Sequence, residues 1–325
     1  MNKEQFIDLV ALHILEYLPK EYKDAQVEVM ERTKNNDTLL HGLIIHSGEK
    51  KDMEAAPIFY LEPYFDVYRF GEKDMEDVMH ELARDYLQVI RNMPQFDLPE
   101  MTREGVEDKV YVKLVNTRSN QERLRDLVSL PVDGGFSLTA YIDMDMPNKD
   151  AMIQITKDLA SRMDFDEREL MQTAMRNTVN AHPAELVEMK KVMMDMSGLR
   201  KLEPGDNLLH DNCSPVEDMS MLILSNSDKF FGATALFYPD VQAKIADATG
   251  GSYYILPSSV HELIILPDNG TLDERELAHM VQSVNSCEVS PEEQLGNKVL
   301  FYNAAADRLM VAVDLDKEKA RGHER

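Results

Sequence analysis

From Val110 to Asn285 the sequence alternates between two hydrophobic periodicities, and this alternation constrains the fold more than any other feature. The first part reads as strand, helix, two strands and helix: VYVKLVN (110–116), NQERLRDL (120–127), VSLPV (128–132), FSLTAYIDMDM (136–146) and DAMIQITKDLASRM (150–163). The same order recurs in MSMLILSN (219–226), PDVQAKIADATG (239–250), SYYILP (252–257), HELIILPD (261–268) and LDERELAHMVQSVN (272–285). Apolar residues two apart indicate strands, and apolar residues three or four apart indicate helices. We therefore expect an α+β fold with mixed sheets flanked by helices.

The repeated β-α-β-β-α order has two interpretations. One is a pair of related lobes produced by internal duplication. The other is chance, because alternating helices and strands match easily without residue identity. A mismatch in strand order between residues 110–162 and 219–285 would remove the first interpretation.

Composition along the chain predicts the domain limits. Residues 1–201 are expected to form an N-terminal α+β region whose C-terminal part is helical. Residues 202–218 gather Pro, Gly, Asn and Asp without periodicity, so this segment is the predicted linker. A C-terminal α+β lobe is expected over 219–313, followed by a charged, flexible tail at 314–325.

The net charge restricts the possible partners. At −24 the chain would repel nucleic-acid phosphates and an anionic membrane, so we expect neither as a direct partner. Acidic residues are spread along the sequence rather than blocked, which is typical of a solvated surface. The alternative is an acidic surface that mimics nucleic acid or meets a basic partner.

Cysteine usage and the N-terminus predict the compartment. Cys213 and Cys287 are far apart and form no Cys-x-x-Cys pair, so neither a disulfide framework nor a zinc ribbon is expected. The first residues carry acidic side chains within an apolar pattern and lack a cleavage signal. No apolar run approaches the ~20 residues of a membrane span. A cytoplasmic protein is predicted.

One polar cluster, Ser-Ser-Val-His-Glu at 258–262, admits two interpretations. It lies between two apolar, β-rich runs and follows Pro257, which cannot donate to a sheet, so a hairpin turn is favoured. Alternation along a strand would point the last two side chains to opposite faces, whereas a Ser-His-acid relay needs them to converge. For a hydrolase with an unrecognised site, the candidate residues are Ser258, Ser259, His261 and Glu262, with Asp268 nearby.

Motifs for metals and nucleotides are absent from the sequence. Asp143 and Asp145 are candidate ligands for a hard cation, but Pro147 occupies a ligand position of an EF-hand loop and the required glycine is missing. Neither His-Glu-x-x-His nor a glycine-rich phosphate loop occurs. We expect no metal ion and no cofactor.

Methionine is frequent, with 21 residues in 325. Thioethers can bind Cu(I), which is one interpretation of the Met-x-Met pairs. The other is core filling, because Met144/Met146 and Met219/Met221 fall on predicted strands and Met189, Met193 and Met196 share one face of a predicted helix. Core filling is expected.

The segment APIFYLEPYFDVYRFG (56–71) groups aromatic and acidic side chains. Tyrosine combines apolar area with a hydrogen-bonding tip, so such a group can form a binding surface. The candidate binding residues are Tyr60, Glu62, Tyr64 and Tyr68. Core packing is the alternative, and the favoured one.

Several segments together resemble one family. They are APIFYLEPYFDVYRFG, NAHPAELVEM (180–189), MLILSNSDKFFGATALFYP (221–239), YYILPSSVHELIILPD (253–268) and VNSCEVSPEEQLGNKVLFYN (284–303). Their order is similar to that of an uncharacterised bacterial family, domain-of-unknown-function family 5688, found in gut anaerobes of the clostridial group. The resemblance spans about Gly42 to Val313. It implies a bacterial cytoplasm and brings no activity, cofactor or catalytic residue.

The sequence leaves three possible functions. The first is a non-enzymatic binding or regulatory protein that acts through a protein partner, because no catalytic motif is preferred over its structural interpretation. The second is the hydrolase, and the third is an acidic nucleic-acid mimic. The sequence does not determine the oligomeric state.

Overall fold

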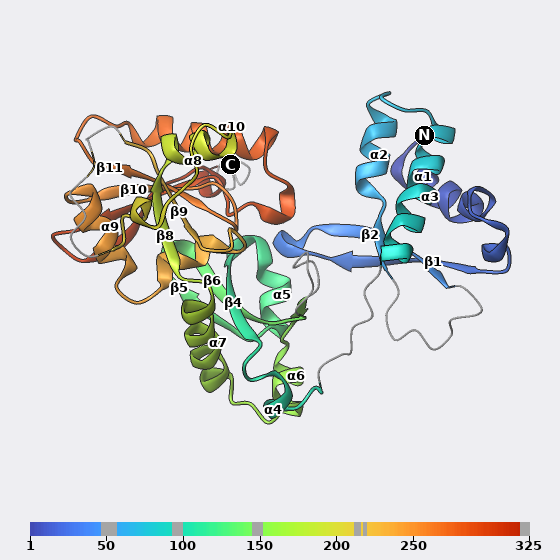
Figure 1. The fold of residues 1–325 in the computed structure, drawn as a ribbon, viewed down its shortest axis with the longest axis horizontal. Helices are drawn as coiled ribbons and strands as arrows, with labels where there is room; N and C mark the ends of the chain where they lie inside the picture. The colour runs from blue at the N-terminus through green and yellow to red at the C-terminus, as the bar shows by residue number, and fades with distance from the viewer. Residues whose placement is uncertain (47–56, 93–99, 145–151, 211–215, 217–219, 319–325) are drawn as a thin grey trace. The chain divides into compact units, whose positions relative to one another are not determined.

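The computed structural model describes residues 1–46, 57–92, 100–144, 152–210, 216 and 220–318. The chain forms two compact units, drawn in Figure 1. Unit 1 contains Met1–Lys34 and Thr38–Asp97, and unit 2 contains Asn35–Asp37 and Leu98–Arg325. No helix in these described ranges combines the length and the apolar character that crossing a bilayer requires.

Unit 1 is a small sheet covered by helices. Strands β1 (Gln26–Thr33), β2 (Leu39–His46) and β3 (Phe59–Tyr60) pair antiparallel in that order. The helices are α1 (Lys3–His13), α2 (Glu62–Arg69) and α3 (Met75–Asn92). Their apolar faces meet the sheet in one core that includes Phe6, Leu43, Leu82 and Tyr86. A three-stranded sheet needs such a cover, because it buries too little apolar surface alone.

The first sheet of unit 2 has four strands. Its path is β4 (Val110–Asn116), β6 (Phe136–Asp143) and β5 (Ser129–Val132), and β7 (Met152–Gln154) also pairs with β6. Helix α7 (Glu167–Ala181) packs on this sheet. The shorter helices α4 (Arg103–Val106), α5 (Gln121–Asp126) and α6 (Lys157–Arg162) complete this part.

Side-chain hydroxyls satisfy the free edge of β4. The N–H of Val112 donates to Thr178 Oγ1 of α7 at 2.9 Å, and the N–H of Leu114 donates to Thr234 Oγ1 at 3.0 Å. Thr234 belongs to the 3₁₀ helix η8 (Gly232–Phe237). A buried backbone N–H group is costly when it lacks a hydrogen-bond acceptor. These two threonines supply the acceptors and so fix α7 and η8 against β4.

The second sheet of unit 2 has six strands in the order β13-β12-β10-β11-β9-β8. All its pairings are antiparallel. The strands are β8 (Ala184–Glu188), β9 (Leu222–Asn226), β10 (Tyr253–Pro257), β11 (Leu263–Pro267), β12 (Lys298–Asn303) and β13 (Arg308–Asp314); the helices are α8 (Met189–Met196), α9 (Val241–Thr249) and α10 (Glu274–Cys287). The expected α+β class is confirmed.

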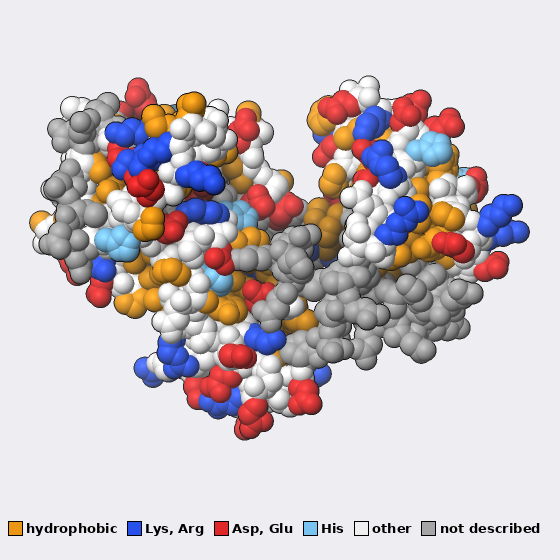
Figure 2. All heavy atoms as spheres, viewed as in Figure 1, with side chains coloured by type: hydrophobic (Ala, Val, Ile, Leu, Met, Phe, Trp, Pro, Cys, Tyr) orange, Lys and Arg blue, Asp and Glu red, His pale blue; other side chains and the backbone are white. Residues whose placement is uncertain are grey.

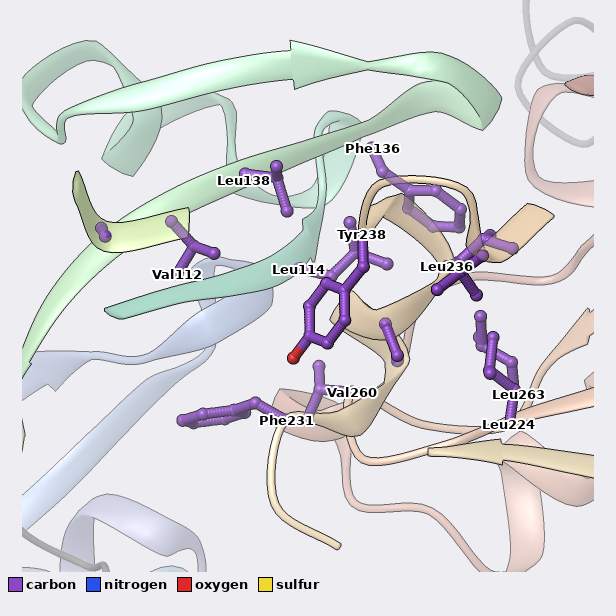
Figure 3. Packing of buried hydrophobic residues seen from close by; sticks show 14 of the residues in the cluster. Val112, Leu114, Phe136, Leu138, Leu224, Phe231, Leu236, Tyr238, Val260 and Leu263 are labelled. Carbon is purple, nitrogen blue, oxygen red and sulfur yellow. The ribbon is translucent and has the colours of Figure 1, made fainter. Parts of the chain in front are cut away.

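One hydrophobic core serves both sheets of unit 2. Figure 3 shows Leu114 and Leu138 of the first sheet pointing towards Leu236 and Tyr238, with Leu224 of the second sheet in the same cluster. Helix α10 packs on the opposite part of the second sheet, over a smaller core. The shared core explains why the two sheets form a single unit.

The strand orders bear on the internal duplication. In the first sheet β4 pairs with β6, and β6 with β5; in the second β9 pairs with β11, and β11 with β10. Both sets are antiparallel, so the orders agree. A duplication stays a prediction, since equal order is not residue identity.

The two units differ from the domain limits expected from composition. Leu186 of β8 donates its N–H to Asn207 Oδ1 at 3.0 Å, and the N–H of Leu208 donates to the carbonyl of Leu186 at 2.8 Å. This described part of the predicted linker therefore follows the edge of β8. β8 itself lies within the predicted N-terminal region but pairs with β9 of the predicted C-terminal lobe.

Candidate functional site

The Ser-Ser-Val-His-Glu cluster forms the turn between β10 and β11. Pro257 is opposite Leu263, so the predicted hairpin is confirmed. The N–H of His261 donates to Ser259 Oγ at 3.0 Å, and the N–H of Ser259 donates to the carbonyl of Glu262 at 3.1 Å. These polar atoms therefore close the turn.

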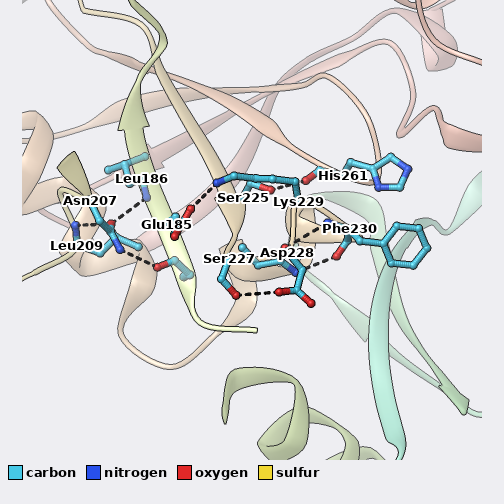
Figure 4. A network of polar contacts seen from close by, with 12 residues as sticks. Glu185, Leu186, Asn207, Leu209, Ser225, Ser227, Asp228, Lys229, Phe230 and His261 are labelled. Atoms are coloured by element: carbon cyan, nitrogen blue, oxygen red, sulfur yellow. Dashed lines mark hydrogen bonds and ion pairs between the residues drawn. The ribbon is translucent and has the colours of Figure 1, made fainter. Parts of the chain in front are cut away.

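The imidazole of His261 contacts groups other than serine. Its Nδ1 accepts the N–H of Phe231 at 3.2 Å, and its Nε2 lies 3.3 Å from Glu293 Oε1. Ser225 Oγ does reach His261, but it donates to the backbone carbonyl at 2.8 Å (Figure 4). Both ring nitrogens are engaged, so the structure does not bring the predicted serines and His261 together as a relay. Asp268 Oδ1 accepts the N–H of Gly270 in the next turn.

Among the predicted binding residues of unit 1, Glu62 is held by an ion pair and hydrogen bonds. Lys3 Nζ lies 2.7 Å from Glu62 Oε1, and His41 donates to the carboxylate from its backbone N–H at 3.0 Å and lies 2.8 Å away through Nδ1. Burial opposes ionisation, but these hydrogen bonds hold the pKa of Glu62 below its ordinary value. This carboxylate fixes α2 to α1 and β2.

The three predicted binding tyrosines also have partners within unit 1. Their contacts are the Tyr64 hydroxyl to Asp85 Oδ2 at 2.9 Å, the Tyr68 ring to the Phe6 ring at 5.7 Å, and Lys34 Nζ over the Tyr60 ring at 4.5 Å. Burial and the hydrogen bond to Asp85 raise the pKa of Tyr64. The structure thus places these side chains in intramolecular packing, and their role in binding stays a prediction.

Of the two predicted cation ligands, Asp143 and Asp145, the structure describes only the first. Asp143 ends β6, and its backbone N–H donates to the carbonyl of Lys109 at 3.0 Å. Asp145 lies outside the described residues. In the described part of the chain, no group of three or more His, Cys, Asp or Glu side chains is placed to hold a metal ion.

Helix α8 contradicts the expectation that its methionines fill the core. Met193 is 63% exposed and Met196 is 83% exposed. Met194 and Leu199 are exposed as well, and none of the α8 residues is buried. We call Met193, Met194, Met196 and Leu199 the methionine surface. The predicted helix is confirmed, but Met193 and Met196 of its predicted apolar face are exposed, and Met189 is half-buried.

Local sequence explains why α8 forms and where it ends. Six of the eight residues of α8 are Met or Lys, which are good helix formers, so the segment can be helical without a buried apolar face. Ser197 Oγ donates to the carbonyl of Met193 at 2.9 Å, and Gly198 adopts φ +71°, the left-handed conformation that ends many helices. The N–H of Leu199 then donates to the carbonyl of Met194 at 3.0 Å, which keeps Leu199 beside the last turn.

An ion network fastens α8 in place of an apolar core. Lys191 Nζ lies 3.0 Å from Glu188 and 3.1 Å from Asp206, and Arg200 lies 2.9 Å from Asp206. Lys190 pairs with Glu188 at 2.7 Å. The backbone N–H of Glu203, with Arg200 and Lys191, lowers the pKa of Asp206 to about 2.

The geometry of this network determines the charge around the methionine surface. Asp206 is only 4% exposed, whereas the Lys190 side chain is 63% exposed and Lys201 is exposed. Asp195, the acidic residue of α8 itself, accepts the N–H of Leu202 at 3.2 Å. In Figure 2, Lys and Arg side chains lie among hydrophobic and acidic ones in the region where Figure 1 places α8. The rim therefore carries the exposed lysines Lys190 and Lys201 next to the exposed acids Asp195 and Glu203.

Comparison with known proteins gives a family and no activity. Residues 3–304 match a family of unknown function, DUF5688. The chain belongs to that family. No curated protein and no solved structure matches it. The family assignment confirms the resemblance seen in the sequence, and the case for a function rests on the site itself.

Proposed function

We propose that this DUF5688 protein is a non-enzymatic binding or regulatory protein that acts through a protein partner, and that the partner binds the methionine surface. One observation carries the proposal: four large apolar side chains within seven residues are exposed together. Exposed apolar patches with a polar rim mark interaction sites. Methionine suits such a surface, because its flexible thioether adapts to different partner shapes.

The rim indicates the chemistry of the partner. Lys190 and Lys201 are exposed beside the methionine surface. The carboxylates of Glu188 and Asp206 are largely buried in ion pairs, whereas Asp195 and Glu203 are exposed. We therefore propose a partner segment that carries aliphatic or aromatic side chains next to carboxylates. The net charge of −24 supports this choice, because the rest of the surface would repel such a segment and favour its encounter with α8.

A random peptide library displayed on phage and selected on the full chain tests the proposal. We expect enriched peptides that combine apolar residues with Asp or Glu. Their affinity should fall at least tenfold for the double variant Met193→Gln and Met196→Gln, since glutamine keeps the shape but adds polar atoms. Met280→Gln is the matched control, because Met280 is 47% exposed on α10 and lies outside the methionine surface.

A charge variant tests the proposed carboxylates of the partner separately from the proposed binding site. Lys201→Glu should weaken the selected acidic peptides and reduce the dependence of their affinity on salt. Failure to enrich any peptide, or enriched peptides that bind the methionine variants as tightly as the native chain, would contradict a protein partner at α8. Enriched peptides without carboxylates would contradict the proposed chemistry.

The proposal keeps the bacterial cytoplasm as the compartment, in line with the scarcity of cysteine. The hydrolase gains no support from the described contacts, because the imidazole of His261 contacts Phe231 and Glu293 instead of a serine. An acidic mimic would need carboxylates aligned on one face, whereas many of the described ones pair with Lys or Arg, as in Arg103 with Glu169 and Arg162 with Asp158.

A further inference from the structure

Unit 2 contains a pocket of about 710 Å³ between α7 and the edge strand β5. Its apolar lining comes from Leu130, Leu138, Met171, Met175, Val179 and Pro239. The pocket exists because β5 has only four residues and α7 packs mainly over β4 and β6, which leaves Leu130 49% exposed. Its size lies within the roughly 300–1,000 Å³ of small-molecule sites.

Two arginines of α7 stand at this apolar lining. Arg168 and Arg176 are eight residues apart, so they share the helix side of Met171 and Met175 and are separated by about 12 Å along the axis. Within the described residues neither guanidinium forms an ion pair; Arg176 makes a long contact of 3.4 Å with Thr173 of its own helix. Both arginines are exposed to solvent.

We infer that this pocket binds a small amphipathic anion, an aliphatic chain that ends in a carboxylate. The chain would contact the methionines, Leu138 and Val179, and the carboxylate would accept charge-assisted hydrogen bonds from Arg168 or Arg176. Glu167 also lines the pocket, and within the described residues it forms no ion pair with Arg168.

Two observations favour a small molecule over an extended peptide. The edge of β5 carries Pro131, which has no N–H to offer an added strand. A second hollow of about 600 Å³ shares Val179 and Pro239 with the first pocket, so an aliphatic chain longer than the first pocket can continue there. This inference is independent of the methionine surface, which belongs to α8.

Fluorescence titration of the full chain with 11-(dansylamino)undecanoic acid tests the inference. We expect saturable binding with a stoichiometry of one, and displacement by dodecanoate at concentrations at least tenfold lower than by dodecanol. The double variant Arg168→Gln and Arg176→Gln should bind the probe at least tenfold more weakly. Arg308→Gln is the matched control, because Arg308 is exposed on β13 and lacks an ion pair among the described residues.

A second variant locates the apolar part of the site. Met175→Trp fills the pocket and should abolish probe binding while circular dichroism and thermal unfolding stay close to native. Saturable binding that dodecanol displaces as well as dodecanoate, or that persists in the arginine and tryptophan variants, would overturn the inference. Absence of saturable binding to the native chain would overturn it too.

Discussion

The backbone N–H of Phe231 donates to Nδ1 of His261 at 3.2 Å, and the two rings stack with an interplanar angle of 6°. This pair joins the segment after β9 to the β10–β11 turn. Phe231 has φ 52°, a left-handed conformation that costs a bulky residue about 1–3 kcal/mol. An Nδ1 that accepts an N–H carries no hydrogen, so the neutral ring has its hydrogen on Nε2, towards Glu293.

The residue after Phe231 allows a direct test of this packing. A Cβ at Gly232 would lie 2.1 Å from Ser225 Oγ and 2.5 Å from the carbonyl of His261. Gly232→Ala should lower the free energy of unfolding by about 3 kcal/mol, because buried backbone must move. Urea denaturation measures this change. Gly205→Ala, where nothing lies within 4 Å, is the control, and equal stability of the two variants would contradict the close packing at Gly232.

The ion network under α8 predicts a dependence of stability on acid. The pKa of Asp206 is about 2 in the folded chain and higher in the unfolded chain, so its contribution is complete above about pH 4 and is lost as the pH falls towards 2. Asp206→Asn should lower the free energy of unfolding by about 2 kcal/mol at pH 6. The difference from the native chain should shrink between pH 4 and pH 2.

Urea denaturation at several pH values checks this prediction. Asp158→Asn is the control, because Asp158 pairs with Arg162 on the surface, where ion pairs contribute little. A difference between Asp206→Asn and the native chain that stays constant down to pH 2 would show that the charge of Asp206 does not stabilise the network.

A buried lysine predicts a second rise of stability with pH, in a higher range. Lys298 is 4% exposed; its Nζ donates to the carbonyls of Gly134 at 2.8 Å and Gly135 at 3.2 Å and lies over the Phe136 ring. Burial lowers the pKa of Lys298 to about 7, although nearby carboxylates act against it. The unfolded chain therefore binds more protons between pH 7 and pH 10, and the free energy of unfolding rises with pH in that range.

Lys298→Met should remove this rise. Relative to the variant, the native chain should gain up to about 4 kcal/mol of stability between pH 7 and pH 10, since one pKa unit corresponds to about 1.4 kcal/mol. Chemical denaturation at pH 7, 8.5 and 10 measures the gain, with the exposed Lys201→Met as the control. Parallel pH profiles for the native chain and Lys298→Met would be incompatible with a neutral buried amine.

Local pattern predicted the elements that depend on nearest neighbours in sequence. Two apolar, β-rich runs separated by Pro257 and two serines were enough to predict the β10–β11 hairpin, because strand pairing across a short turn is a local contact. The helix around Met193 was also predicted from periodicity. Its exposure was not, because periodicity identifies an apolar face and leaves open whether another part of the chain covers it.

The sequence by itself determined the α+β class and the family, since these follow from periodicity, turn chemistry and recognisable segments. It did not indicate strands β7 and β8, which lie inside segments expected to be helical. Only the tertiary structure decided that Asp206 anchors α8 through Lys191 and Arg200 while Met193 and Met196 face solvent. It alone placed β8 beside β9 in one sheet. The physical reason is that burial and ion pairing depend on contacts between residues distant in sequence, which no local pattern encodes.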